Sequence, residues 1–131
     1  MMLDRLLAAV TLVLFAAAMG ADADNPLTPV EARGKVGEKI TVEMTVRASK
    51  DRLQKRGEIY LDSEADFHDA KNFAVVITKM GAASLKKTGI TDPAVHFKGK
   101  VIRVSGTVKE VDEIPRIEID DAKQIRVVPQ Q

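Results

Sequence analysis

The sequence predicts a mainly β fold, a five-stranded Greek-key barrel with a short helix between the third and fourth strands. Apolar and polar residues alternate in short runs between residues 38 and 128, which is the period of half-buried strands. The stretch 81–89 breaks this alternation, suits a short helix and ends in glycine. Residues 96–128 then form two alternating arms around a tight return, which is typical of an antiparallel hairpin.

The first three strands are expected between residues 38 and 79. Residues 38–49 alternate strictly and form the first strand, and the basic segment 50–56 is either a loop or an extension of that strand. Residues 57–63 form the second strand, and an acidic connection at 64–71 leads to the third. The third strand, 73–79, is almost continuously apolar, which indicates burial on both faces.

The closing hairpin supplies the fourth and fifth strands, at 100–110 and 116–120. Gly106 lies inside the first arm, where glycine marks a bulge or a bend at a barrel corner. Before the hairpin, Asp92-Pro93 begins a further turn of helix, and Phe97 at its end is expected to close the bottom of the barrel. The apolar run 125–128 completes the barrel or covers its first strand.

The chain begins with the pattern of a secretory signal peptide. A short polar start with one basic residue, Arg5, precedes an apolar run at 6–19, and Ala21-Asp22-Ala23 has the small-x-small pattern of a cleavage site. We therefore expect a signal peptide at 1–23, a linker at 24–33 and one domain at 34–128. The alternative is an uncleaved anchor, although the apolar run is shorter than the roughly 20 residues of a membrane span. The cleaved protein is expected in the periplasm or secreted, without stable membrane insertion.

Composition excludes several kinds of chemistry. Cysteine is absent, which excludes disulfides, thiol catalysis and a lipoprotein anchor, and the net charge of +1 does not by itself indicate nucleic acid. The two histidines, His68 and His96, lack metal-ligand spacing, and no catalytic or phosphate-binding motif occurs. We therefore expect no enzyme activity, no cofactor and no metal. A calcium module at 62–69 is the weaker alternative to a solvated acidic turn.

Three segments carry a resemblance to a known fold family: Val36 to Val42, Asn72 to Ile77, and the hairpin at 96–128. Over residues 34–128 the chain resembles secreted bacterial OB-fold domains of the nucleic-acid-binding and tRNA-anticodon-binding-like kind. The resemblance implies that ligands bind the outer face of strands two and three and the adjoining loops. A second group with this fold, periplasmic proteins linked to stress responses, is not expected to bind nucleic acid.

A basic segment lies at the loop that this fold uses for ligands. Single-strand binding needs cations for phosphates and aromatic faces for bases. Tyr60 is the best stacking candidate, because its parity is opposite to that of the apolar residues beside it. Phe73 is assigned to the core, and Phe67 to packing under the acidic connection. The candidate binding residues are Arg47, Lys50, Arg52, Lys55, Arg56, Tyr60 and Lys79.

The return at 110–114 opposes strong nucleic-acid binding, because Glu110, Asp112 and Glu113 repel phosphate. The sequence therefore predicts an exported, non-enzymatic OB-fold module that binds single-stranded nucleic acid or another polyanion weakly and without sequence preference. The alternative is a periplasmic stress-response or structural module that binds an envelope protein or a small cationic ligand through the acidic return.

Overall fold

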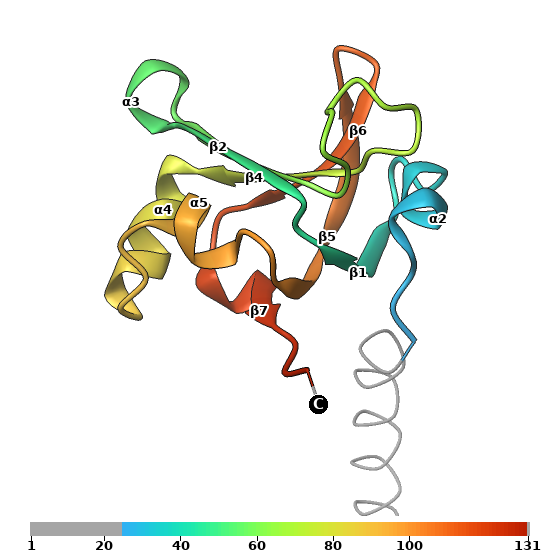
Figure 1. Cartoon of the computed structure of the whole chain (residues 1–131). Coiled ribbons are helices and arrows are strands. Elements are labelled where there is room, and N and C mark those ends of the chain that lie inside the picture. Colours follow the sequence, from blue (N-terminus) through green and yellow to red (C-terminus); the bar gives the residue numbers. More distant parts are fainter. Residues whose placement is uncertain (1–24, 131) are drawn as a thin grey trace, which may run out of the picture.

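The computed structural model describes residues 25–130. The predicted signal peptide, 1–23, lies outside the described residues. The fold is mainly β, as predicted, with a mixed sheet of seven strands in the order β1-β5-β6-β4-β3-β2 and β7 paired to β5 (Figure 1). The strands are β1 (Lys39–Thr45), β2 (Ala48–Arg52), β3 (Glu58–Asp62), β4 (Ala74–Thr78), β5 (Val101–Val111), β6 (Ile114–Ile119) and β7 (Ile125–Val127).

The prediction of five strands in a barrel was wrong in the number of strands and in closure. The sheet is not closed, because β1 and β2 stand at the two ends of the strand order. The predicted strand 38–49 divides at Val46 and Arg47. The Val46 amide donates to the Lys100 carbonyl, and the next amide, of Arg47, donates to the Asp62 carbonyl. Consecutive amides thus bond to different strands, so the chain leaves β5 and joins β3 at this point.

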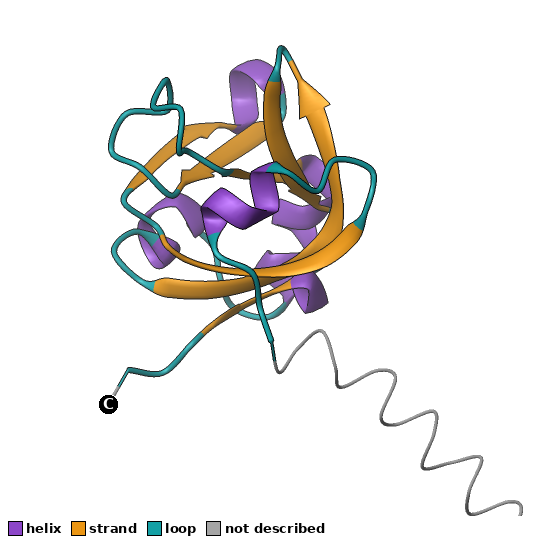
Figure 2. Ribbon diagram, turned by 90° about the vertical axis from the view of Figure 1, so that its right-hand side faces the viewer, coloured by secondary structure: helices purple, strands orange, loops and turns teal. Residues whose placement is uncertain are grey.

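The sheet is curved (Figure 2), and it encloses one apolar core. Antiparallel pairs predominate, and β4 and β6 form the parallel pair. Phe73 is fully buried, as predicted, and Phe97 is 1% exposed. The core side chains alternate along the strands with outward polar ones, as the period of two requires. They include Val42, Met44, Ile59, Leu61, Val75, Ile77, Ile102, Val104, Ile117 and Ile119.

Short helices lie at one end of the sheet and beside its first strand, β1 (Figure 1). Helices α4 (Lys79–Lys87) and α5 (Pro93–Phe97) lie between β4 and β5, which agrees with the predicted helix between the third and fourth strands. Thr78 caps α4 by accepting from the Gly81 amide at 3.2 Å. The remaining short helices are α2 (Pro29–Arg33), α3 (Leu53–Arg56) and the 3-10 turn η1 (Ala122–Gln124). None of the helices within residues 25–130 is long and apolar enough to cross a membrane.

Part of the segment predicted as a linker, 24–33, packs against the domain. The Leu27 amide donates to the Thr41 carbonyl at 2.8 Å, and the Leu27 carbonyl accepts from Glu43 at 2.9 Å. Helix α2 follows, with a capping box between Thr28 and Glu31, and its Ala32 is fully buried. The segment therefore contributes an ordered edge to β1.

The acidic return is shorter than the sequence suggested. Strand pairing continues through Val111 and Ile114, so only Asp112 and Glu113 form the turn. Both have positive φ, 51° and 67°, which is the conformation of a type I′ hairpin turn. Non-glycine residues are strained there, and an acidic pair also repels itself.

Replacing this turn with Asn-Gly (Asp112→Asn/Glu113→Gly) is expected to stabilise the protein by about 1 kcal/mol, because these residues adopt positive φ with less strain. The melting temperature should rise by about 4–8 °C in a domain of this size. The exchanged order, Asp112→Gly/Glu113→Asn, is the matched control and should stabilise less. An unchanged or lower melting temperature for Asn-Gly would contradict the turn assignment.

Candidate functional site

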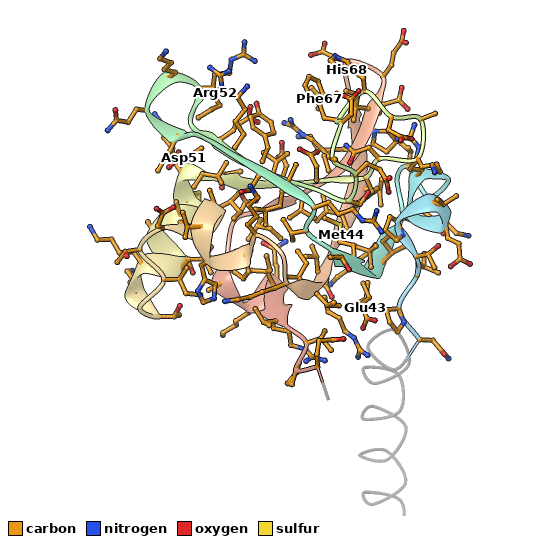
Figure 3. The ribbon with its side chains drawn as sticks, in the orientation of Figure 1. Glu43, Met44, Asp51, Arg52, Phe67 and His68 are labelled. Atoms are coloured by element: carbon orange, nitrogen blue, oxygen red, sulfur yellow. The ribbon has the colours of Figure 1, made fainter. Side chains whose placement is uncertain are left out.

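A cleft of about 320 Å³ lies over the outer face of β3 and β4. Arg52, on β2, and Phe67, in the loop after β3, stand at opposite sides of this region (Figure 3). Its volume is at the lower end of the range for small-ligand clefts, about 300–1,000 Å³. The lining residues are Lys50, Arg52, Arg56, Tyr60, Asp62, Phe67, Asn72, Ala74, Val76, Val111, Asp112, Ile114 and Arg116.

Strand register sets the floor of the cleft. Lys50, Tyr60 and Val76 are register partners on β2, β3 and β4, so they share the outward face. Two residues further along β3, Asp62 is the register partner of Ala48 on β2 and of Ala74 on β4. The floor therefore has an aromatic ring in one row and a carboxylate between two alanines in the next.

The first wall of the cleft is cationic. Lys50 and Arg52 share a face of β2 because they are two residues apart. The Asp51 carboxylate then accepts from the Leu53 amide at 2.9 Å and begins α3, which ends at Gly57 in the left-handed conformation with φ 73°. This single turn of helix carries Arg56 to the rim of the cleft.

The structure brings together four of the seven residues that the sequence singled out: Lys50, Arg52, Arg56 and Tyr60 line the cleft. Lys55 is exposed on α3 beside it but does not line it. Lys79 is exposed at the start of α4, and its aliphatic chain packs close to Gly57. Arg47 lies elsewhere, in a separate groove between α2 and β1. The positions of Arg47 and Lys79 involve contacts between distant segments, which strand parity does not reveal.

Phe67 is the cleft residue that sequence reasoning misassigned. We expected it to pack under the acidic connection, but it is 50% exposed and lines the cleft. The centroid of its ring lies 3.9 Å from that of the His68 ring. The loop 63–73 has no strand or helix period, so the sequence pattern gave no direction for this side chain. The signal available in the sequence was an aromatic residue in the polar connection after the second strand, on the side of the fold where ligands are expected.

Ion pairs cross the floor of the cleft and hold its polar side chains in place. The Tyr60 hydroxyl donates to Glu58 at 2.6 Å, and the other oxygen of Glu58 accepts from Arg116 at 2.9 Å. Arg116 also donates to Glu118 at 2.5 Å, and Lys109 donates to Glu118 at 3.0 Å. Arg116 is therefore largely neutralised, and the excess positive charge of the cleft comes from β2 and α3.

The network also sets the protonation of its members. Burial, followed by the hydrogen bond to Glu58, raises the pKa of Tyr60, so its hydroxyl remains a donor at neutral pH. Burial alone would raise the pKa of Glu118, but hydrogen bonds from Lys109 and Arg116 outweigh it and lower that pKa. Within residues 25–130, the Arg116 Nε is the buried side-chain polar atom that lacks a partner.

Asp62 is a nearly buried carboxylate that faces the cleft. It is 8% exposed and accepts from the Asn72 side-chain amide at 2.9 Å. The carbonyl oxygen of that amide accepts from the Glu64 backbone amide at 3.0 Å, and the Arg33 guanidinium donates to the Asn72 backbone carbonyl. Burial raises the pKa of Asp62, and the Asn72 hydrogen bond opposes this only in part.

Asp62→Asn is expected to stabilise the protein at neutral pH. The pKa of Asp62 is higher in the folded state than in the unfolded state, so its stabilising contribution is present below the unfolded pKa and is lost as pH rises through the folded pKa. The difference in unfolding free energy between variant and wild type should therefore shrink as pH falls below the folded pKa. Urea unfolding at pH 4 and pH 7 measures it, and an equal difference at both values would contradict this account. Asp112→Asn, at an exposed carboxylate, is the control.

The acidic connection does not gather metal ligands. Among residues 25–130, no group of three or more His, Asp or Glu side chains is placed to hold a metal ion. Asp66 instead accepts from the His68 backbone amide at 2.9 Å and from its ring nitrogen at 3.1 Å. The backbone bond, then the ring, lower the pKa of Asp66. Residues 66–69 thus form a hydrogen-bonded acidic turn after β3.

Comparison with known proteins finds the fold but no family. No family model matches the chain, and no curated protein matches it. Among solved structures, asparaginyl-tRNA synthetase from Pyrococcus horikoshii matches 79% of this chain at 14% identity and a TM-score of 0.53. A putative aspartyl-tRNA synthetase from Leishmania major Friedlin matches 82% at 12% identity and a TM-score of 0.51. OBody AM1L10, bound to hen egg-white lysozyme, matches 79% at 13% identity and a TM-score of 0.53.

These similarities support the OB fold. The chain covers 23% and 21% of the two synthetases, so the likeness concerns one domain of each. It covers 93% of the OBody chain. At these identities the likeness extends to the fold alone, and the chemistry of the cleft has to be argued from this chain's own residues.

Proposed function

We propose that this chain is a non-enzymatic OB-fold module that binds single-stranded nucleic acid in the cleft over β3 and β4. The observation that carries the proposal is the set of side chains that meet there. Lys50, Arg52 and Arg56 supply positive charge for phosphates, and Tyr60 and Phe67 supply aromatic faces. Single-strand binding requires both kinds of group along one groove.

Charge supports weak binding that depends mainly on the backbone of the nucleic acid. Two acids, Asp62 and Asp112, line the cleft together with the cationic wall of Lys50, Arg52 and Arg56. The fourth cation of the cleft, Arg116, is held by Glu58 and Glu118. The net attraction for phosphate is therefore modest. Nucleic-acid contacts of this kind give dissociation constants of about 10⁻⁴–10⁻⁶ M at physiological salt.

A fluorescence-anisotropy titration with labelled single-stranded DNA tests the proposal. We expect saturable binding at low salt, weaker binding as salt rises, and weaker binding of the matching duplex, whose bases cannot reach the aromatic faces. An absence of binding at low salt, where phosphate contacts are strongest, would remove the proposal.

The exposed aromatic residue gives a sharper test of the stacking role. Phe67→Ala is expected to weaken single-strand binding about tenfold, because stacking is worth about 1–3 kcal/mol per base. Phe67→Trp is the matched variant and should retain binding. Both variants should fold normally, since the side chain is 50% exposed. Equal affinities for Phe67→Ala and wild type would exclude stacking on this ring.

A second candidate function is binding of a protein or a small cationic ligand through the acidic turn. The OBody, with the same fold, is bound to a protein, lysozyme. Asp112→Asn/Glu113→Gly separates the two functions, since it removes both acidic charges from the hairpin tip. It should strengthen nucleic-acid binding, whereas it should weaken binding of a cationic partner.

We also propose that the module works outside the cytoplasm, as a periplasmic or secreted protein. The support is the sequence pattern of residues 1–23. N-terminal sequencing of the protein from fractionated cells should find Asp24 first in the envelope or the medium. Full-length protein in the membrane fraction would indicate a retained anchor instead.

A further inference from the structure

The floor of the cleft holds one group that phosphate binding does not use. Asp62 is an anion in a cleft whose proposed ligand is also an anion, and burial disfavours its charge. An apolar residue at this position would serve the core, and a basic one would serve phosphate. The carboxylate therefore suits a ligand group that donates hydrogen bonds, which phosphate does not.

The surroundings of Asp62 leave one side of the carboxylate open. Its register partners on β2 and β4 are alanines, Ala48 and Ala74, whose side chains end at Cβ. Oδ1 accepts from Asn72, and Asp62 makes no ion pair within residues 25–130. On the floor of the cleft, the Arg116 guanidinium is held by Glu58 and Glu118.

Asn72 orients this carboxylate rather than competing with it. Its amide nitrogen donates to Asp62, while its amide oxygen accepts from the Glu64 backbone and lies 3.4 Å from the Ser63 hydroxyl. Asn72 is 1% exposed, so its orientation is fixed. Asp62 is thus a pre-oriented acceptor at the base of a cleft that also contains Tyr60 and Phe67.

We propose that Asp62 reads the Watson–Crick edge of an unpaired guanine stacked in this cleft. An ionised carboxylate only accepts hydrogen bonds. Guanine presents two adjacent donors on that edge, the N1 imino and the N2 amino groups. Adenine and cytosine present an amino donor beside an acceptor nitrogen, and uracil or thymine presents an imino donor between two carbonyls, so each would place an acceptor against the carboxylate. Unpaired bases are commonly recognised by stacking combined with contacts to this edge.

This inference rests on the proposed function and adds a base preference to it. The cationic wall contacts phosphates of any sequence, whereas Asp62 acts on one base at the bottom of the cleft. We therefore expect affinity to depend on whether guanine is available for that position.

The test is a binding series with the purified protein at low salt. The probe is a short oligothymidine that carries one central dG, deoxyinosine, dA, dC or dT. We expect the dG probe to bind about tenfold more tightly than the dA, dC and dT probes. Deoxyinosine, which keeps the imino donor and lacks the amino group, should be intermediate.

Two variants with the same loss of charge locate the effect. Asp62→Asn should lose the preference for dG, while Asp112→Asn, which removes a carboxylate from the rim of the same cleft, should retain it. Thermal melts confirm that both variants fold. The wild-type base series decides the question by itself if Asp62→Asn does not fold.

The outcomes separate this inference from the function on which it rests. Equal affinity for all probes, or a dG preference that survives Asp62→Asn, overturns guanine recognition while nucleic-acid binding stands. Failure of every probe to bind at low salt overturns both.

Discussion

Replacement of Lys50, Arg52 and Arg56 together by alanine is expected to weaken single-stranded DNA binding about 100-fold at low salt. These residues form the cationic wall of the cleft, and no other described side chains of the cleft carry unneutralised positive charge. Each phosphate contact contributes about 0.7 to the slope of log K against log salt for single strands, so the slope should fall by about 2. Anisotropy titrations across a salt series measure both quantities.

The matched control is Lys86→Ala/Lys87→Ala/Lys98→Ala. These lysines are exposed on α4 and directly after α5, and they do not line the cleft. Replacing them removes the same net charge as the cleft variant. The control should bind within about threefold of wild type with nearly the same slope. Equal losses in the two triple variants would show that binding responds to overall charge and not to this cleft.

Gly81→Ala is expected to destabilise the protein by about 3 kcal/mol, the largest effect on stability that we predict for a single methyl group. Gly81 lies in the first turn of α4, where the helix packs against the end of β6. A Cβ there would lie 2.0 Å from the carbonyl oxygen of Ile119. The same oxygen accepts from the Thr78 hydroxyl at 3.1 Å, so helix and strand are held together at this point and cannot separate freely.

Thermal or urea unfolding measures this effect, with a fall in melting temperature of more than about 10 °C expected. Gly34→Ala is the control. Its φ of −85° suits alanine, and the nearest atom to an added Cβ is at an ordinary 3.6 Å. A Gly81→Ala variant as stable as the control would mean that α4 does not pack against β6 as described.

Strand parity predicted much of the fold, because a strand with one buried face has apolar residues at every second position of the sequence. The alternation around Ile59 and Leu61 placed Tyr60 outward, and the structure puts it on the floor of the cleft. The division of the first strand could not be predicted in the same way. It occurs where the amides of Val46 and Arg47 bond to Lys100 and Asp62, residues that only the folded chain brings near.

The site was predictable only in part for the same reason. Lys50 and Arg52 could be placed on one face by their spacing, whereas Phe67 lies in a loop without a period. The neutralisation of Arg116 depends on Glu58, which is 58 residues away in the chain. The alternation that places Tyr60 outward also places Asp62 outward, two residues later. Asp62 is nevertheless only 8% exposed, and it lies beside its partner Asn72 from the loop after β3.

Mapping of backbone amide shifts during titration with single-stranded DNA tests the central claim most directly, since it reports where the ligand sits without any mutation. We predict that the largest shifts fall at residues 50–62, 66–74 and 111–116, the segments that form the cleft. Shifts concentrated instead on α2, α4 or β7, with these segments unmoved, would contradict the assignment of this cleft as the binding site.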